Sequence, residues 1–289
     1  MRYLVAGCLA LAVLGGSAQA ATSILFVGNS FTAGAESSAI NYRADEVHDL
    51  GPRGDDGLTI GGIPALFKTF TKQADLDFDV TLETEGGVGL DYHYRQKLPL
   101  LDRAWDVVVL QSYSTLDARR PGDPGLLVEY AKKFDTAFHA RNPDVKIYLN
   151  ATWSCADLTY PNRTPWHGQG IEQMALDIAK GYDEARKASR GITDVVPVGK
   201  AWNRAFATGF AGSNPYDGIA ENQVNLWASD NHHASEFGSY LEALVVFGKI
   251  TGRDPLSLGP KETAAGDFGF TPEQTTALQQ IAHDELAAE

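Results

Sequence analysis

The chain has 289 residues and a formal net charge of −13 at pH 7. An acidic surface repels phosphate backbones, so this charge argues against nucleic-acid binding. Acidic glycans would be repelled at long range as well, although acidity of this kind also simply keeps an exported protein in solution.

The first twenty residues have the pattern of a secretory signal peptide. Arg2 precedes an apolar run over residues 4–14, and the small-residue site Ala18-Gln19-Ala20 follows it. We therefore expect cleavage near Ala20 and Ala21, and a secreted or periplasmic protein. Residues 5–8 also resemble a lipobox, but their cysteine stands near the start of the apolar run rather than after it. No later stretch reaches the roughly 18 to 20 apolar residues that span a bilayer, so we expect no stable membrane insertion.

The remaining sequence, residues 21–289, has a length that suits one α/β domain. After signal removal Cys155 is the one cysteine left, so no intramolecular disulfide can form. We expect Cys155 to be a small buried hydrophobic residue. The sequence leaves the oligomeric state open.

Short runs rich in β-branched residues predict the strands of a sheet. They have the continuous apolar character of strands that are buried on both faces, which is typical of parallel sheets. The runs are Ser23–Val27, Phe78–Thr84, Asp106–Leu110, Val145–Asn150 and Asp194–Val198.

Helical patterns alternate with these runs. Apolar residues recur at helical spacing over residues 127–138 and 171–185, and residues 235–251 have one strong apolar face. Residues 271–274 form a capping box with proline at the first helical position. Such alternation predicts a three-layer α/β/α sandwich of flavodoxin-like type around a mostly parallel, roughly five-stranded sheet.

Residues 32–62 depart from this pattern because they are rich in Gly, Ala, Ser and Asp. The segment is predicted to be a loop insertion. A loop of this length is uncommon unless it serves function, so a lid or cleft wall and a disordered insertion are both open interpretations.

Ser30 follows the first predicted strand, in Gly28-Asn29-Ser30-Phe31. Ligands of open α/β sheets gather outside the carboxyl ends of the strands, so a serine there is exposed to substrate and held by rigid backbone. Gly28 permits a sharp turn.

Far downstream, Asp230 precedes His233 by three residues. At that spacing the carboxylate can hold one imidazole nitrogen, which fixes the tautomer and stabilises the imidazolium. The adjacent His232 and His233 also suggest metal binding, but neighbouring residues rarely present two nitrogens to one ion, and no further ligands stand at zinc-like spacing. We expect no metal site and no cofactor.

Together these segments resemble the SGNH/GDSL hydrolase superfamily, over most of the mature chain. Gly28-Asn29-Ser30-Phe31 is similar to its first block, commonly Gly-Asp-Ser-Leu, and Asp230-Asn231-His232-His233 to its last, Asp-x-x-His. A bacterial group within it begins Gly-Asn-Ser-Phe-Thr and carries Gly-Gly-x-x-Leu-x-x-His, matched by residues 86–93, and a strand ending in Leu-Gln, matched at Leu110-Gln111.

The resemblance implies that Ser30 is the nucleophile, His233 the general base and then acid, and Asp230 its orienting carboxylate. It also implies an oxyanion hole formed by the backbone N–H groups of Ser30 and Gly87, with Gly86 as the alternative to Gly87. Gln111 stands where the superfamily has an asparagine, and a glutamine amide offers the same donor on a longer stem. Satisfying loop backbone is the other interpretation of Gln111.

Three further residues are candidates for contact with substrate. Asn29 adjoins the nucleophile, His93 either lines the cleft or is a polar residue at a helix start, and Trp153 serves either sugar stacking or core packing. The resemblance implies an exported serine esterase that acts through an acyl-enzyme on small-molecule or glycan esters, above all O-acetyl groups on carbohydrate. A lipase or thioesterase, and a non-catalytic carbohydrate-binding protein on the same scaffold, are the alternatives.

Overall fold

The computed structural model describes residues 20–51, 59–161 and 163–289. The expected signal peptide therefore lies almost wholly outside the described residues, as do residues 52–58 of the expected insertion. In the described residues six strands form one sheet, and every strand pairing is parallel. The strands are β1 (Thr22–Gly28), β2 (His48–Asp49), β3 (Phe78–Thr84), β4 (Val107–Leu110), β5 (Lys146–Asn150) and β6 (Ile192–Val196).

The strand order is β2-β3-β1-β4-β5-β6, which places β1 between β3 and β4. Gly28 is paired with Thr84 on one side, and Val27 with Leu110 on the other. Because the three strands are parallel, their carboxyl ends meet at one edge of the sheet. The segments that follow them therefore lie side by side.

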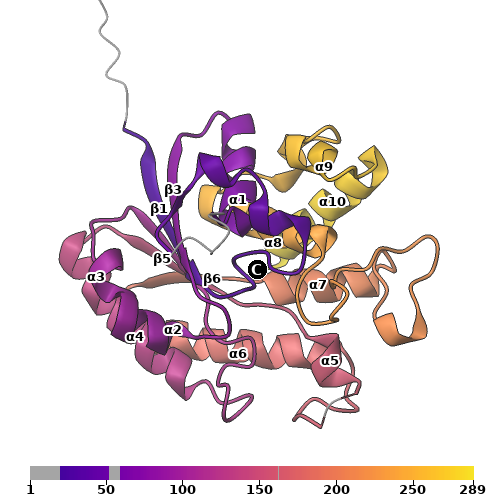
Figure 1. The fold of residues 1–289 in the computed structure, drawn as a ribbon, viewed down its shortest axis with the longest axis horizontal. Helices are drawn as coiled ribbons and strands as arrows, with labels where there is room; N and C mark the ends of the chain where they lie inside the picture. Colours follow the sequence, from indigo (N-terminus) through magenta and orange to yellow (C-terminus); the bar gives the residue numbers. More distant parts are fainter. Residues whose placement is uncertain (1–19, 52–58, 162) are drawn as a thin grey trace, which may run out of the picture.

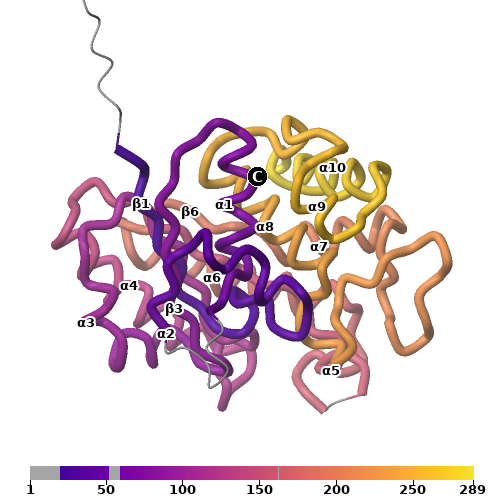
Figure 2. Tube along the Cα trace, turned by 45° about the horizontal axis from the view of Figure 1, so that its top comes forward, coloured from indigo at the N-terminus to yellow at the C-terminus, as the bar shows by residue number. Residues whose placement is uncertain are grey.

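Helices cover both faces of the sheet, as the alternating pattern predicted. In Figures 1 and 2, α3 and α4 lie on the side of the molecule away from α9 and α10. Helix α4 packs on α6, whereas α8 packs on α1 and α10, and α7 contacts α6, α8 and α10. The longer helices are α1 (Gly62–Gln73), α4 (Gly125–Arg141), α6 (Glu172–Ala188), α7 (Val198–Ala207), α8 (Glu236–Thr251) and α10 (Pro272–Ala288). Shorter ones are α2 (Leu90–Tyr92), α3 (Leu98–Leu101), α5 (Ala156–Thr159) and α9 (Thr263–Asp267), with the 3₁₀ turns η1 (Ser38–Asn41), η2 (Ala44–Glu46), η4 (Pro215–Asp217) and η5 (Pro255–Leu258) and the π turn η3 (His93–Lys97).

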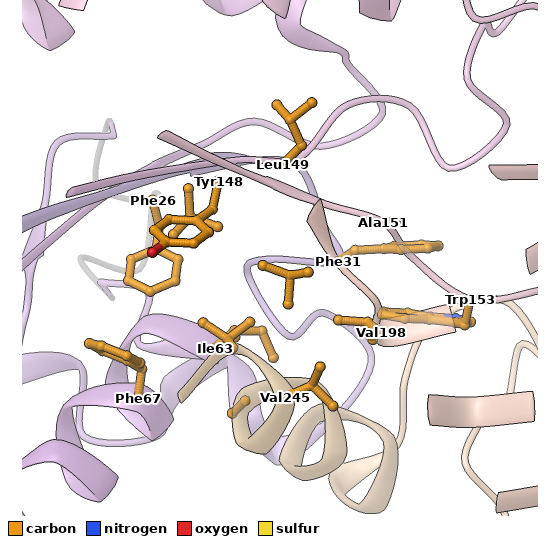
Figure 3. Close-up of a cluster of buried hydrophobic side chains, with 14 of the residues drawn as sticks. Phe26, Phe31, Ile63, Phe67, Tyr148, Leu149, Ala151, Trp153, Val198 and Val245 are labelled. Atoms are coloured by element: carbon orange, nitrogen blue, oxygen red, sulfur yellow. The ribbon is translucent and has the colours of Figure 1, made fainter. Parts of the chain in front are cut away.

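A cluster of large apolar side chains fills the space between the sheet and the helices α1 and α8 (Figure 3). It joins Phe26 of β1 and Tyr148 of β5 to Ile63 and Phe67 of α1 and Val245 of α8. The rings of Phe26 and Phe67 meet edge to face, with centroids 5.6 Å apart. Burial of this kind on both faces explains why the strands read as continuous apolar runs.

The predicted α/β/α architecture and the parallel sheet are confirmed. The last predicted strand, Asp194–Val198, lies two residues earlier because Pro197 ends the strand and Val198 begins α7. The capping box at Thr271 and Gln274 is present at the start of α10. Over the described residues, no helix is both long and apolar enough to cross a membrane.

The expected insertion at residues 32–62 contributes the two-residue strand β2, so the sheet has six strands, which is compatible with the roughly five that were expected. Its described parts are also packed: Ala39 is fully buried, Tyr42 nearly so, and the Gly61 N–H donates to the Ile40 carbonyl. A disordered insertion is therefore wrong for residues 32–51 and 59–62, which pack on α1 and α8.

Glu242 on α8 is a completely buried acid beneath the sheet. The Asn150 Nδ2 donates to its Oε1 at 2.6 Å, and its Oε2 has no partner within the part of the chain that the structure describes. Burial raises the pKa of this carboxyl from 4.5 to about 8, and the hydrogen bond from Asn150 offsets only part of that rise. Glu242 is therefore a neutral carboxylic acid at neutral pH.

The buried acid predicts a specific dependence of stability on pH. Above pH 4.5 the unfolded chain loses a proton at this site that the folded chain keeps until about pH 8, so the free energy of unfolding falls as pH rises through this window. The Glu242→Gln variant lacks this titration. We expect the Tm of the variant, relative to the Tm of the wild type, to increase from pH 5 to pH 8 in thermal unfolding followed by circular dichroism. The exposed Glu221→Gln is the control, and a Glu242→Gln advantage that did not grow with pH would contradict the prediction.

Candidate active site

The turn that carries Ser30 is held by the side chain of Asn29. The Asn29 Nδ2 donates to the carbonyl of Val88 at 3.0 Å and to that of Ser112 at 3.2 Å, and its Oδ1 accepts from the Phe31 N–H at 3.1 Å. Asn29 is 4% exposed. Ser30 is thereby fixed between the segments that follow β3 and β4. Asn29 was expected to contact substrate, but it is buried and its amide is committed to the backbone.

Gly28 is required by close packing at the same turn. A Cβ atom there would lie 2.1 Å from the Oγ1 of Thr32 and 2.7 Å from the Oε1 of Gln111, distances that real Cβ atoms do not show. Any side chain at this position would force the turn that carries Ser30 away from β4. The predicted role of Gly28 in the turn thus has a steric basis.

Ser30, His233 and Asp230 form one chain of hydrogen bonds, although 203 residues separate the serine from the histidine. The Nε2 of His233 lies 2.8 Å from the Oγ of Ser30, and its Nδ1 lies 2.6 Å from the Oδ2 of Asp230. The Oδ1 of Asp230 accepts from the N–H groups of His232 and His233, both at 3.0 Å. Ser30 is partly exposed, and the His233 side chain is 19% exposed. The structure therefore brings the three expected catalytic residues together.

These contacts keep Asp230 ionised. Partial burial raises the pKa of its carboxyl, but the hydrogen bonds from the His233 ring and from the N–H groups of His232 and His233 outweigh it and hold the pKa below its ordinary range. An ionised Asp230 accepts the Nδ1 proton of His233, which leaves the Nε2 free to accept a proton from Ser30.

The loop that carries Asp230 and His233 is a tight turn with defined ends. Asn231 adopts the left-handed conformation at φ +60°, and the Ala228 N–H donates to the His233 carbonyl at 2.8 Å. Asparagine tolerates this conformation better than most residues. Ser235 then caps α8, with its Oγ accepting from the Gly238 N–H. The rigid start of α8 thus supports the histidine.

The segment that follows β3 contacts the turn that carries Ser30. The Glu85 N–H donates to the Gly28 carbonyl, and the Val88 carbonyl accepts from Asn29, so both ends of the turn are tied to the end of β1. Between them Gly86 and Gly87 are exposed, and Gly87 has a φ of +71°. Within the described residues, the N–H groups of Ser30, Gly86 and Gly87 donate no hydrogen bond. They are available to an anionic oxygen.

Gln111 does not complete an oxyanion hole in this structure. Its Oε1 accepts from the Asn29 N–H at 2.8 Å and from the Thr32 Oγ1 at 3.1 Å, and its Nε2 donates to the Ser112 carbonyl. The side chain is 1% exposed, so it is enclosed by the turns it joins. The geometry favours the alternative interpretation, in which Gln111 satisfies loop backbone.

Two other expected substrate contacts are also buried. His93 is 0% exposed, and its Nδ1 is hydrogen-bonded to the buried carboxylate of Glu83. Trp153 is 0% exposed and stacks between Phe31 at 4.3 Å and Trp202 at 4.6 Å. Both are therefore structural. Trp153 supports the turn that carries Ser30 through Phe31 and offers no face to a sugar.

Sequence reasoning missed a second cluster next to His233. The Nδ1 of His232 lies 3.0 Å from the Oδ1 of Asp157, and Cys155 is close to both. Burial raises the pKa of the Cys155 thiol. Burial alone would lower the pKa of His232, but the interactions of its ring with Cys155 and Asp157 outweigh that effect and raise the pKa. The two adjacent histidines were visible in the sequence, but the approach of His232 to Asp157 and Cys155, more than 70 positions away, was not.

The hydrogen bonds of Asn29 predict a loss of stability on truncation. Asn29→Ala leaves the partly buried carbonyl of Val88 without its donor and removes one donor from the buried carbonyl of Ser112, so we expect the free energy of unfolding to fall by about 1–3 kcal/mol in urea titrations. Gln169→Ala is the control, because the Gln169 amide also donates to a backbone carbonyl but is exposed. Equal losses in the two variants would show that Asn29 does not hold the turn.

Comparison with known proteins finds relatives in structure. No family model matches the chain, and no curated protein matches it. A DUF4886 family protein from Bacteroides uniformis is 17% identical with a TM-score of 0.63, and the match covers 92% of this chain and 95% of that one. A protein from Parabacteroides merdae described as a GDSL-like lipase is also 17% identical, with a TM-score of 0.54, over 80% of this chain and 95% of that one. As the sequence motifs predicted, the chain has the fold of the SGNH/GDSL hydrolases.

Proposed function

We propose that the protein hydrolyses carboxylic esters through an acyl-enzyme formed on Ser30. The observation that carries the proposal is the continuous hydrogen-bonded chain from the Ser30 Oγ through His233 to Asp230. Each member has the contact that its role needs: the nucleophile touches the base, and the base touches the carboxylate that orients it.

The proposed reaction follows from these contacts. The Oγ of Ser30 attacks the ester carbonyl while the Nε2 of His233 takes the hydroxyl proton, and the developing imidazolium is stabilised by Asp230. His233 then gives the proton to the leaving alcohol, and the acyl group stays on Ser30. Water attacks the acyl-enzyme in the reverse sense, with His233 again as the base, and releases the carboxylic acid.

The negative oxygen of each tetrahedral intermediate needs donors that are already in place. We assign this role to the backbone N–H groups of Ser30 and Gly87, with no contribution from the Gln111 side chain. The hydrogen bonds of Glu85 and Asn29 hold the Gly87 turn beside Ser30 before substrate arrives. Preorganised donors of this kind cost no rearrangement during the reaction.

For the substrate we propose O-acetyl groups on carbohydrate, processed by an exported enzyme. This finer assignment rests on the motif resemblance and on the signal-like first twenty residues. The burial of Trp153 removes the aromatic platform that this residue suggested in the sequence. A screen of acetylated sugars against longer fatty-acyl esters and thioesters separates the acetylesterase from the lipase and thioesterase alternatives.

Loss of the nucleophile or the base should abolish hydrolysis without unfolding the protein. We expect Ser30→Ala and His233→Gln each to lower kcat/KM for a short-chain chromogenic ester by at least about 1,000-fold, because the residues act as one unit. Ser257→Ala and His167→Gln change exposed residues of the same types and serve as controls. Circular dichroism checks the fold. If Ser30→Ala kept more than about a hundredth of the wild-type rate, Ser30 would not be the nucleophile.

Asp230 should be needed to orient His233, because the Oδ2 of Asp230 lies 2.6 Å from the Nδ1 of the ring. Asp230→Asn keeps an oxygen for the backbone N–H groups but cannot hold the ring in the required tautomer, so we expect kcat/KM to fall by about 10,000-fold. Initial rates with a short-chain chromogenic ester test this statement. An Asp230→Asn variant close to wild type would exclude His233 as a base oriented by Asp230.

A further inference from the structure

Three side chains with different donor atoms converge next to the turn that carries His233. Cys155 offers sulfur, Asp157 oxygen and His232 nitrogen, and these atoms all lie within 4.8 Å of one another. Within the described residues, no other group of three or more His, Cys, Asp and Glu side chains is gathered so closely. The cluster shares no side chain with the Ser30, His233 and Asp230 chain.

The two segments that supply the three donors are joined by hydrogen bonds to backbone carbonyls. The Asp157 N–H donates to the Asn231 carbonyl at 3.1 Å, and the Trp153 Nε1 donates to the His232 carbonyl at 3.1 Å. Trp153 is itself fixed in the aromatic stack. The donors are therefore brought together by the fold and need only small side-chain movements to meet at one point.

The burial of the cluster is graded from the inside outward. Cys155 is 0% exposed, whereas the side chains of His232 and Asp157 are 26% and 24% exposed. An ion could therefore reach the site past the histidine and aspartate and meet the thiol at its inner end. Water would fill any remaining position on the outer side.

We propose that Cys155, Asp157 and His232 bind one Zn²⁺ ion beside the active site. Thiolate, imidazole and carboxylate are the ligands that zinc takes in proteins, at about 2.0 to 2.3 Å from the metal. Donor atoms that surround a tetrahedral ion at those distances lie roughly 3 to 4 Å apart, close to the spacing of this cluster. On binding, the Cys155 thiol would release its proton and coordinate as a thiolate.

The consequence of such a site would be structural. His232 precedes His233 on the tight turn, so an ion held by His232 and the segment 155–157 would cross-link that turn to the start of α5. The proposal concerns metal binding alone and does not depend on ester hydrolysis.

The test uses the purified full chain without an affinity tag. Metal-free protein is titrated with Co²⁺ and, separately, with Zn²⁺, and excess ion is removed before the bound metal is counted. We expect one ion per chain, a thiolate-to-cobalt charge-transfer band for the Co²⁺ form, and a Tm raised by roughly 5 °C or more by saturating Zn²⁺.

Matched variants identify the ligands. Cys155→Ser and Asp157→Asn should each weaken Zn²⁺ binding by roughly 10- to 100-fold or more, because loss of a group that only contacts a ligand already has an effect of that size. Cys155→Ser should also abolish the charge-transfer band. His167→Gln is the control, because His167 is exposed and outside the cluster. Ser30→Ala should bind Zn²⁺ like the wild type, so loss of the proposed esterase activity and loss of metal binding are separable.

Two results would overturn the proposal. One is a wild-type chain that takes up neither ion and shows no shift in Tm. The other is binding that Cys155→Ser and Asp157→Asn leave unchanged, or bound Co²⁺ without the thiolate band. If Cys155→Ser does not fold, Asp157→Asn and the cobalt spectrum of the wild type still decide the matter.

Discussion

The side-chain amide of Asn29 joins the ends of three strands. It donates to the carbonyls of Val88 and Ser112, in the segments that follow β3 and β4, and it belongs itself to the turn after β1. A buried amide with two carbonyl partners is costly to displace, because the amide would lose both hydrogen bonds inside the protein without gaining water. The position of Ser30 and of the Gly86-Gly87 turn both depend on this junction.

The turn before α8 divides its two histidines between different partners. His233 lies between Ser30 and Asp230, whereas His232 lies against Asp157 and Cys155. Their rings are 5.1 Å apart, and both pack edge-on against Phe31. Phe31 in turn stacks on Trp153, so the aromatic core reaches directly under the reacting groups. Rigid support of this kind keeps a hydrogen-bonded chain aligned before substrate binds.

Three residues that were expected to contact the substrate or its oxyanion are buried in the structure. Gln111 and His93 were candidates because of their motif positions, and Trp153 because it is aromatic, yet each is at most 1% exposed. Their hydrogen bonds and stacking hold the segments around Ser30 in place. A motif position therefore indicates that a residue belongs to the site. It does not show whether the residue would contact a substrate or instead holds neighbouring segments in place.

The sequence by itself indicated the layers of the fold and singled out Ser30, Asp230 and His233, which the structure brings together. Continuous apolar runs can be satisfied only in a sheet that is covered on both faces, and the spacing of Asp230 and His233 is a local property of one turn. Only the tertiary structure decided which distant groups meet. Three features join segments that are far apart in the chain. They are the pairing of β2 with β3, the hydrogen bonds of Gln111 with Asn29 and Thr32, and the cluster of Cys155, Asp157 and His232. Such contacts depend on strand order and on the packing of helices against the sheet, and neither leaves a periodic trace in the sequence.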